Sequence, residues 1–246
     1  MIIEKSTHAD WLSNAYLVAD RPGGHAVLVD TGGPSEPILK RAAELDVKVT
    51  HALCTHHHHD HVANNRLFKQ KLGCRICGHA DEKRLFGALD EELRDGSEIR
   101  TGGLRIRAVH IPGHTVGQLA FVANEEAVFT GDTLFRRAVG GTRAPGHATY
   151  GEIKNSIMNV LMKLPAEMRV YPGHMEETTI GEEWESNPFI RIWRGLDSPG
   201  SRRCTALGEP ATLVLRARDY DGGTKCWVRF DEGGKDDIVP GSQVED

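Results

Sequence analysis

The sequence predicts an α/β protein in which two β-containing layers pack together and helices lie outside them. Short apolar runs rich in β-branched residues alternate with segments of helical spacing in the N-terminal part of the chain. A strand-rich middle follows, and a second mixed portion comes after it. One-sided strands and helices must all bury their apolar faces, and packing sheet against sheet with helices outside is the economical solution.

The N-terminal part is predicted to open with a β-hairpin. The apolar runs 14–19 and 26–29 flank Arg21-Pro22-Gly23-Gly24, a composition that favours a turn. A helix is expected over 36–45, after a Pro-Ser-Glu-Pro start, because its apolar residues recur at helical spacing. That helix leads to a buried strand over 47–54.

The later elements are expected from the same two signals, apolar residues at helical spacing and short apolar runs. Helices are predicted over 62–72 and 81–93, with strands over 74–77, 102–111, 118–123 and 127–130. Irregular loops at the ends of such strands present side chains over a rigid frame, so functional residues are sought there.

Composition limits the function classes. A chain of 246 residues with 39% hydrophobic content can bury one large core, or one core and a small satellite domain. A net charge of -5 argues against nucleic acid as a partner, so we expect a small-molecule substrate. The N-terminus does not resemble a signal peptide and no apolar run approaches the length of a membrane span, which predicts a cytoplasmic protein without a membrane partner.

The five cysteines do not resemble a disulfide framework. Cys74 and Cys77 have the spacing of a zinc knuckle, but no second pair follows them. In a strand their side chains would face opposite ways. A metal role for this pair is therefore not favoured.

The run Thr55-His56-His57-His58-His59-Asp60-His61 is the main candidate for a metal site. Alternate residues beyond a strand project to one side, so His56, His58 and Asp60 can converge, and His61 joins them from the next turn of chain. Imidazole and carboxylate suit zinc, non-haem iron or manganese. The alternatives are a histidine tag or a solvated loop, but a tag would be terminal and would lack the internal aspartate.

Three further stretches fall at the ends of predicted strands, at 112–117, 130–135 and 171–174. Each carries one His or Asp beside glycine, which lets the backbone turn sharply and approach a metal closely. Taken alone each is weak, because a lone histidine in a loop is more often a surface residue and Gly-Asp-Thr is a common turn.

Taken together, the THxHxDH run, a PGHTxG loop, a GDTLF loop and a late histidine resemble the metallo-β-lactamase fold hydrolases. The closest resemblance is to the glyoxalase II-like branch, and it extends over about residues 1 to 195. It implies an αββα sandwich with the metals at one edge of the paired sheets.

The resemblance also implies a ligand set and two divalent ions, zinc first, with iron or manganese as alternatives. The first metal would be held by His56, His58 and His114, the second by Asp60, His61 and His174, and Asp132 would bridge them. Asp60 and Asp132 are also the residues expected to act in catalysis. His57 and His59 match no ligand position, and Asp30 matches a position whose role is structural.

The implied chemistry is hydrolysis by a metal-bridging hydroxide, formed because the metals lower the pKa of water. A thiolate leaves without a strong general acid, whereas an amide nitrogen needs a proton, and the sequence offers no obvious acid for that step. The expected activity is therefore that of a thioesterase of the hydroxyacylglutathione hydrolase type, with a small-molecule thioester as substrate.

The sequence departs from the family pattern near the substrate. Gly141 stands where relatives commonly carry a cation that contacts the thiol-bearing part of the substrate. Arg137 or Arg143, with Arg136 as a third choice, are the candidates to replace it, since an arginine fork suits a carboxylate; the alternative is that they are solvated surface residues. Ala63-Asn64 replaces Gly-Gly, and the glutathione-binding helical extension is absent, so the thiol carrier stays open.

The composition changes near Asp197, which predicts a hydrolase domain over 1–196 and a small β domain over 197–246. β-type runs at 211–217, 225–230 and 237–240 suggest an SH3-like or Tudor-like barrel. An element that dimerises or that caps an exposed sheet edge is favoured over peptide or nucleic-acid recognition. If it dimerises, the protein is a homo-oligomer through its C-terminal domain.

Two further functions compete with the hydrolase. A persulfide dioxygenase on the same fold uses one iron held by two histidines and a carboxylate, and His56, His114 and Asp132 occupy the matching positions. A non-catalytic scaffold acting through residues 197–246 is the third hypothesis, which a full ligand set disfavours. The acyl group of the substrate is not determined by the sequence.

Overall fold

A computed structural model describes all 246 residues, Met1–Asp246, and the chain divides into two compact units. The first comprises Met1–His110, Gly117–Gly131 and Tyr171–Met175. The second comprises Ile111–Val116, Asp132–Val170 and Glu176–Asp246. This division does not coincide with the boundary predicted between residues 196 and 197, which stays a prediction about domains.

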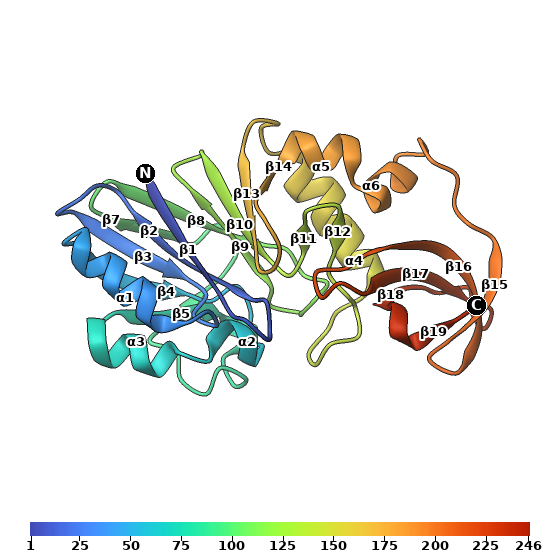
Figure 1. Cartoon of the computed structure of the whole chain (residues 1–246), viewed down its shortest axis with the longest axis horizontal. Coiled ribbons are helices and arrows are strands. Elements are labelled where there is room, and N and C mark those ends of the chain that lie inside the picture. The colour runs from blue at the N-terminus through green and yellow to red at the C-terminus, as the bar shows by residue number, and fades with distance from the viewer. The chain divides into compact units, whose positions relative to one another are not determined.

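The first unit contains a six-stranded sheet with the order β1-β2-β3-β4-β5-β6 (Figure 1). Its strands are β1 Ile2–Thr7, β2 Asn14–Ala19, β3 His25–Val29, β4 Lys48–Leu53, β5 Arg75–His79 and β6 Glu91–Leu93. β2 pairs antiparallel with β3, which confirms the predicted hairpin, and β3 to β6 run parallel. The His-rich run therefore leaves the sheet from the carboxyl end of a central parallel strand.

A second sheet in this unit has the order β13-β10-β9-β8-β7. Its strands are β7 Glu98–Thr101, β8 Leu104–His110, β9 Leu119–Ala123, β10 Ala127–Gly131 and β13 Arg169–Pro172. The three predicted strands of the middle segment are confirmed as β8, β9 and β10. β13 begins in the second unit and ends in the first, where the Gly173 N–H donates to the Gly131 carbonyl at 2.9 Å.

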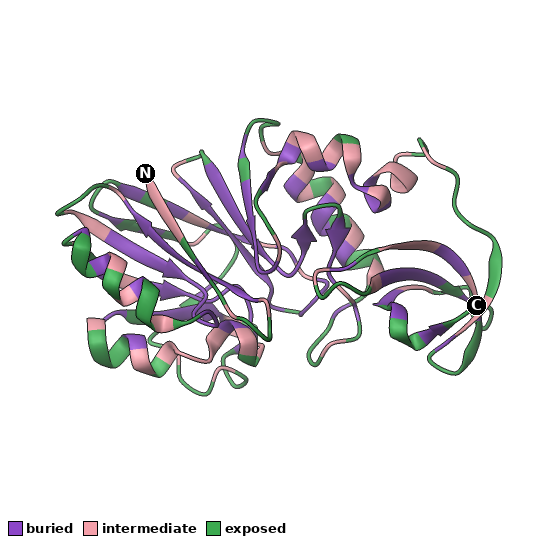
Figure 2. Ribbon diagram, in the orientation of Figure 1, coloured by how far each residue is buried: buried purple, intermediate pink, exposed green.

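Side-chain alternation explains why the two sheets pack together. Tyr16 and Val18 of β2 join an apolar cluster that includes Phe121 and Phe129 of the second sheet. Leu17 of β2 points to the opposite face, into a separate cluster formed with the helices. Figure 2 shows these strands as buried along most of their length. The unit is thus layered as helices, sheet and sheet.

Three helices belong to the first unit: α1 Ser35–Glu44, α2 His59–Val62 and α3 Asn65–Leu72. Ile38 and Ala42 of α1 and Phe68 of α3 are buried against the first sheet. α1 confirms its prediction. The single helix expected over 62–72 is wrong, because Asn64 donates from Nδ2 to the carbonyls of Thr31 and Gly33 and breaks the chain into two helices.

The helix predicted over 81–93 is also wrong. Only a 3₁₀ turn, Ala80–Glu82, forms there, Gly87 takes a positive φ of 77° and the segment ends as strand β6. The Asp90 carboxylate accepts from the Ile76 N–H at 2.9 Å and draws the segment beside β5. Strands β1 and β7 were not predicted, because their polar residues hide the alternation.

The second unit contains the short hairpin β11 Leu134–Phe135 and β12 Ala138–Val139, and the helices α4 Tyr150–Asn155, α5 Ile180–Ser186 and α6 Pro188–Trp193. α4 continues through a π turn, Ser156–Val160, and a 3₁₀ turn, Leu161–Lys163. β14 Thr178–Thr179 pairs with the first half of β13. Local sequence begins these helices: Thr149 and Glu152 form a capping box, and Asn187 caps α6 ahead of Pro188.

The C-terminal part of the second unit is a five-stranded antiparallel sheet with the order β18-β17-β16-β15-β19. Its strands are β15 Arg202–Ala206, β16 Glu209–Arg218, β17 Thr224–Phe230, β18 Asp236–Pro240 and β19 Val244–Glu245, with a 3₁₀ turn at Gly241–Gln243. Its own core includes Leu213, Val228 and Val239. The small C-terminal β portion is therefore confirmed, and with the paired sheets and helices so is the α/β fold class.

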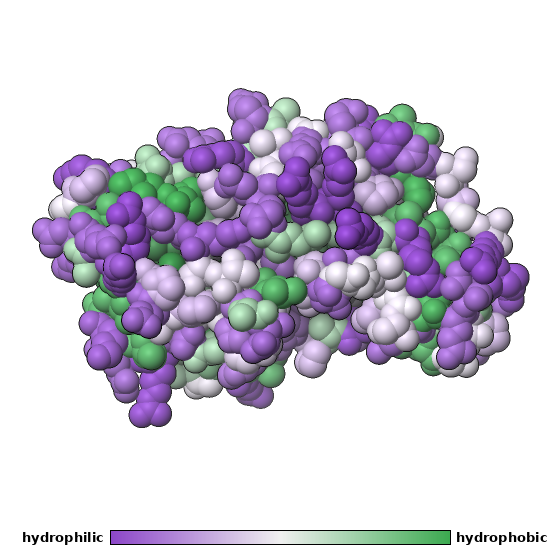
Figure 3. Space-filling view, viewed as in Figure 1, coloured by the Kyte–Doolittle hydropathy of each residue, from purple (hydrophilic) through white to green (hydrophobic).

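None of the helices is both long enough and apolar enough to cross a lipid bilayer. On the face seen in Figure 3, hydrophobic residues occur in small groups among hydrophilic ones. The large hydrophobic side chains that are exposed, such as Leu85 and Leu196, come from separate segments. Single exposed hydrophobic residues of this kind are normal on a protein surface.

Candidate metal centre

The His-rich run is held against the turn that follows β3. The Thr31 N–H donates to the His61 carbonyl at 2.7 Å. A Cβ added to Gly32 would lie 1.4 Å from the Asp60 carbonyl oxygen, so only glycine permits this approach. The run reverses at this contact and enters α2 at His59. Two stretches 30 residues apart thus pack backbone to backbone and place Asp60 and His61.

Asp60, His61 and His174 come together in the first unit. The Nε2 atoms of His61 and His174 lie 3.4 Å and 3.5 Å from Oδ2 of Asp60. Both histidines are fully buried, and the three donor atoms lie within 4.8 Å of one another. Zinc binds imidazole and carboxylate at about 2 Å, so donors at these separations can share one ion.

Asp30 orients His61. Its Oδ2 accepts from Nδ1 of His61 at 2.9 Å, which puts the proton on Nδ1 and turns Nε2 toward Asp60. The same carboxylate accepts from the N–H and the hydroxyl of Thr55, each at 2.8 Å. Asp30 has a φ of 55°, a conformation that aspartate tolerates better than most residues. The family resemblance implies a structural role for Asp30, and its hydrogen bonds to His61 and Thr55 are of that kind.

His174 is positioned by the start of β2. The Asn14 N–H donates to the Gly173 carbonyl at 2.7 Å, and Nδ2 of Asn14 donates to the carbonyls of Pro172 and Met175 at 3.1 and 2.9 Å. Asn14 is fully buried. Sequence reasoning missed this residue, although a polar side chain at the head of an apolar strand was a signal for it.

His56 and His58 form a second group in the same unit. Nε2 of His56 faces Nδ1 of His58 at 3.0 Å, and Nδ1 of His56 lies 3.0 Å from the Thr55 hydroxyl. His56 is fully buried, and its ring lies 4.3 Å from that of His61 between centroids. His56, His58 and His61 are therefore gathered at one place, while Asp60 lies with His61 and His174.

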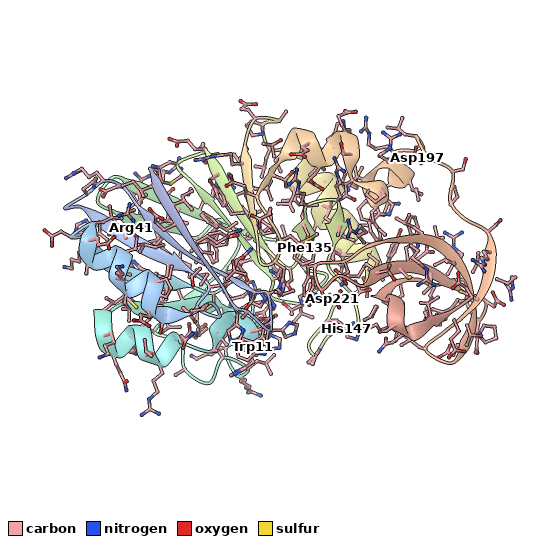
Figure 4. The ribbon with its side chains drawn as sticks, viewed as in Figure 1. Trp11, Arg41, Phe135, His147, Asp197 and Asp221 are labelled. Atoms are coloured by element: carbon pink, nitrogen blue, oxygen red, sulfur yellow. The ribbon has the colours of Figure 1, made fainter.

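His57 and His59, which match no ligand position, have their main contacts with other residues. Nδ1 of His57 donates to the Glu82 carboxylate at 2.9 Å, while His59 is exposed and meets the edge of Trp11, labelled in Figure 4. Glu82 is fully buried and also accepts from the N–H groups of His57 and Gly117, at 3.2 and 2.8 Å. Sequence reasoning missed Glu82, because it stood inside a helix predicted in error.

His114 and Asp132 belong to the second unit. Nε2 of His114 lies 3.6 Å from Oδ2 of Asp132, and Nδ1 donates to the Gly141 carbonyl at 2.9 Å. Gly140 allows this packing, since a Cβ there would lie 1.8 Å from the Asp132 carbonyl oxygen. As with His61, a fixed acceptor on Nδ1 leaves Nε2 as the nitrogen that is able to coordinate a metal.

Both side chains line a cavity of about 240 Å³ within the second unit. Its walls also include Phe135, Arg143, Tyr220, Lys225 and Ile238, so that the C-terminal sheet contributes to it. Sequence reasoning placed no functional residue in that sheet. Figure 4 labels Phe135 of this cavity and Asp221 of the turn that joins Tyr220 to β17.

The three arginines proposed to contact substrate have partners of their own. Arg143 pairs with Asp237 and lies over the Phe230 ring at 5.6 Å, and Arg136 lies 3.3 Å from Glu182. The Arg137 N–H donates to Glu183 at 2.8 Å while its side chain is exposed. Substrate contacts by Arg137 and Arg143 stay predictions.

The cysteine pair is consistent with the negative prediction. Cys77 joins the cluster between the sheets and Cys74 the cluster under the helices, so they face opposite ways. Cys77 does approach His51 and Glu91. Burial, with Glu91 adding to it, raises the pKa of Cys77 to about 12, which disfavours the thiolate that a metal requires.

The side chains present fit divalent metal ions. The donors are neutral imidazoles oriented by Asp30 and by a carbonyl, together with the carboxylates of Asp60 and Asp132. Such nitrogen and oxygen donors suit zinc, iron and manganese rather than calcium or magnesium. Coordinating histidines whose other nitrogen is hydrogen-bonded are the usual arrangement at metal sites.

Paired sheets, outer helices and these histidine and aspartate groups define a metal-binding α/β protein. Residues 9–174 match the metallo-beta-lactamase superfamily, and the chain belongs to that superfamily. A hydroxyacylglutathione hydrolase, GloC, of Haemophilus influenzae is 33% identical over 186 residues, which cover 68% of this chain and 87% of that protein. The likeness to the glyoxalase II-like branch is therefore confirmed.

Solved structures agree with this placement. ETHE1 from Myxococcus xanthus superimposes with a TM-score of 0.69 at 30% identity, over 81% of this chain and 92% of that one. TTHA1623 in a di-iron-bound form has a TM-score of 0.63 at 32% identity, over 76% of this chain and 99% of that one. Neither covers the whole of this chain.

Proposed function

We propose that this chain is a binuclear metal hydrolase that cleaves a thioester of the hydroxyacylglutathione type. The observation that carries the proposal is the group of Asp60, His61 and His174, in which both histidines are fully buried and the donors lie close enough to share an ion. A mononuclear centre built on His56, His114 and Asp132 would make no use of Asp60, His61 and His174. Imidazole and carboxylate donors held this close together are the ligand types that suit zinc, iron or manganese.

The proposed ligand set has seven members. His56, His58 and His114 would hold the first metal, Asp60, His61 and His174 would hold the second, and Asp132 would be shared between them. Seven ligand residues exceed the needs of one tetrahedral zinc ion, which supports a pair of metals. Zinc is proposed because imidazole predominates among the donors; the di-iron form of TTHA1623 keeps iron as the alternative.

Bound metals would supply a water of lowered pKa as nucleophile and would polarise the thioester carbonyl. The protein's own part is to orient these donors before substrate arrives. Asp30 keeps the His61 proton on Nδ1, and the Gly141 carbonyl does the same for His114. The carboxylates of Asp60 and Asp132 would offset part of the positive charge of bound metals.

The leaving group favours a thioester over an amide. A thiol has a pKa near 8.5, so its anion departs without a proton donor, whereas an amide nitrogen must be protonated. The residues around His114 and Asp132 include Lys225 and Arg143, both cations that can stabilise an anion. The names of relatives such as GloC support the same choice. The cytoplasmic location stays a prediction.

A persulfide dioxygenase with one iron is the second candidate. The similarity to ETHE1 from Myxococcus xanthus favours it, and the three ligand positions it needs, His56, His114 and Asp132, are filled. The two candidates differ in metal content and in their use of oxygen. They are therefore separated by experiment rather than by ligand identity.

The test compares His58→Ala with His59→Ala in the purified protein. About two zinc ions per chain and hydrolysis of S-lactoylglutathione are expected for the wild type. His58→Ala should lose metal and activity, whereas the exposed His59 is no ligand and its replacement should change neither.

One iron per chain with oxygen consumption driven by glutathione persulfide would overturn the hydrolase in favour of the dioxygenase. Equal losses in His58→Ala and His59→Ala would instead contradict the ligand assignment, because a non-ligand neighbour would then matter as much as a ligand.

A further inference from the structure

The C-terminal sheet reaches the cavity that His114 and Asp132 line. The Thr142 N–H donates to the Ile238 carbonyl at 3.0 Å, and the Ile238 N–H donates to the Thr142 hydroxyl at 3.1 Å. The neighbouring Gly141 carbonyl holds Nδ1 of His114. Strand β18 thus supports the same loop that orients a metal-ligating histidine, and it is part of this site rather than a separate attachment.

Lys225, at the second position of β17, brings a positive charge to this cavity. Only 8% of its side chain is exposed, and its Nζ lies 2.8 Å from the Asp219 carboxylate and 5.5 Å from the centre of the Tyr220 ring. An ammonium group has three donors, and Asp219 cannot use all of them. Lys225 can therefore bind a second anion from within the cavity.

The position of Lys225 also explains why residue 141 can be a glycine rather than a cation. A Cβ built on Gly141 would meet Nζ of Lys225 at 3.9 Å and the Ile238 carbonyl at 3.5 Å. A lysine or arginine at residue 141 would place a second cation where Lys225 already supplies one. The positive charge at this wall of the cavity therefore comes from Lys225 of β17, and not from the loop that contains Gly141.

We propose that Lys225 binds a carboxylate of the substrate, with the C-terminal sheet forming one wall of the substrate site. Apolar walls from Phe135 and Ile238 and the Gln243 side chain complete the cavity. The ligand class is an anionic thioester, one whose thiol part carries a free carboxylate. The inference rests on the proposed function for the identity of the reaction, but not for the binding of the anion.

The test measures charge selectivity in Lys225→Met. The substrates are S-lactoylglutathione and S-lactoyl-N-acetylcysteamine, which has no charge. We expect KM for the anionic thioester to rise about 10- to 100-fold, since hydrogen bonds to charged groups are the strong ones, with kcat within about twofold. KM for the neutral thioester should hardly change. Lys163→Met, at an exposed site of the same unit, is the matched control.

Removing Lys225 leaves the buried Asp219 carboxylate without its cation, and such an uncompensated charge can unfold the protein. The double variant Lys225→Met/Asp219→Asn removes both charges and keeps the test open. Adding Gly141→Lys to that double variant returns a cation to the same wall, so it should recover a large part of the lost affinity for the anionic thioester. A merely structural role for Lys225 would not produce this recovery.

Binding of S-methylglutathione, measured by calorimetry, gives a readout that needs no turnover. Wild type should bind it, the Lys225 variants at least tenfold more weakly, and the diethyl ester of the ligand equally weakly in both. Unchanged KM and binding in the double variant would overturn the proposal, as would no binding by wild type. If wild type binds S-methylglutathione but hydrolyses neither thioester, the proposed function fails while the assignment of Lys225 stands.

Discussion

The Asp30 carboxylate and Nδ1 of His61 lie 2.9 Å apart in the protein interior, with both side chains almost fully buried. This hydrogen bond decides which nitrogen of His61 is available. With the proton held on Nδ1, Nε2 presents its lone pair toward Asp60 and the neighbouring donors. Asp30 therefore sets which nitrogen of His61 faces the candidate metal site, although the two residues are far apart in the sequence.

Asp30→Asn should lower metal affinity about 10- to 100-fold, the usual cost of losing such a partner. The amide can turn an N–H toward His61 and favour the tautomer that carries its proton on Nε2, where coordination is needed. Asparagine tolerates the positive φ at this position, so the fold should survive. Competition against a chromogenic chelator measures the change, and an affinity equal to that of wild type would contradict the tautomer argument.

Gly32→Ala should displace the Asp60 segment, because the added Cβ would lie 1.4 Å from the Asp60 carbonyl oxygen. We expect loss of bound metal and a decrease of about 3 kcal/mol in the free energy of unfolding, as for other severe overpacking. Metal content and urea unfolding are the measurements. Gly151→Ala is the control, since its Cβ would meet only the Thr149 hydroxyl at 3.8 Å. Similar losses in both variants would refute the close-contact explanation.

Glu82→Gln should reduce the free energy of unfolding by about 1–3 kcal/mol, because a buried amide N–H₂ would replace an oxygen that accepts hydrogen bonds. The carboxylate now receives N–H groups from His57 and Gly117. Glu92→Gln, which breaks an exposed ion pair with Lys83, should cost less than about 0.5 kcal/mol. Chemical denaturation of the two variants checks the contrast, and an equal cost would argue that Glu82 is not an obligatory acceptor.

The stability of the protein should fall below about pH 6.5, in part through His79. Burial, together with the stacked His110, holds the pKa of His79 below its ordinary value of 6.5. The unfolded chain then binds more protons than the native protein, so stability is full above the unfolded pKa and is lost as the pH falls toward the folded pKa. One such group contributes at most about 1.4 kcal/mol per pH unit.

His79→Phe keeps a ring against His110 and removes the titrating nitrogen. The difference in the free energy of unfolding between pH 7.5 and pH 5.5 should therefore be smaller in this variant, even if its absolute stability is lower. Urea titrations at the two pH values provide the comparison. An unchanged difference would assign the acid sensitivity to other histidines.

The local sequence pattern was enough to predict many of the helices and strands of the first unit. The runs that became β2, β3 and β4 are short and largely apolar, and the residues of α1 have apolar side chains at helical spacing. The ligand run could be recognised for the same reason, since His56, His58 and His61 lie within six residues of one another. Order along the chain also identified His114, Asp132 and His174, though only through likeness to a family.

Contacts between distant segments decided the rest. Residues 81–93 have helical spacing in isolation, yet Asp90 binds the backbone of β5 and parallel pairing turns the end of the segment into β6. Glu82 became an acceptor for His57, and Lys225 came to face the loop at Gly141, neither of which any local pattern encodes. The sequence by itself determined which side chains could bind metal, because that is a property of residue type and short spacing. The tertiary structure decided which tautomers, acceptors and charges surround them, because those depend on close approach across the fold.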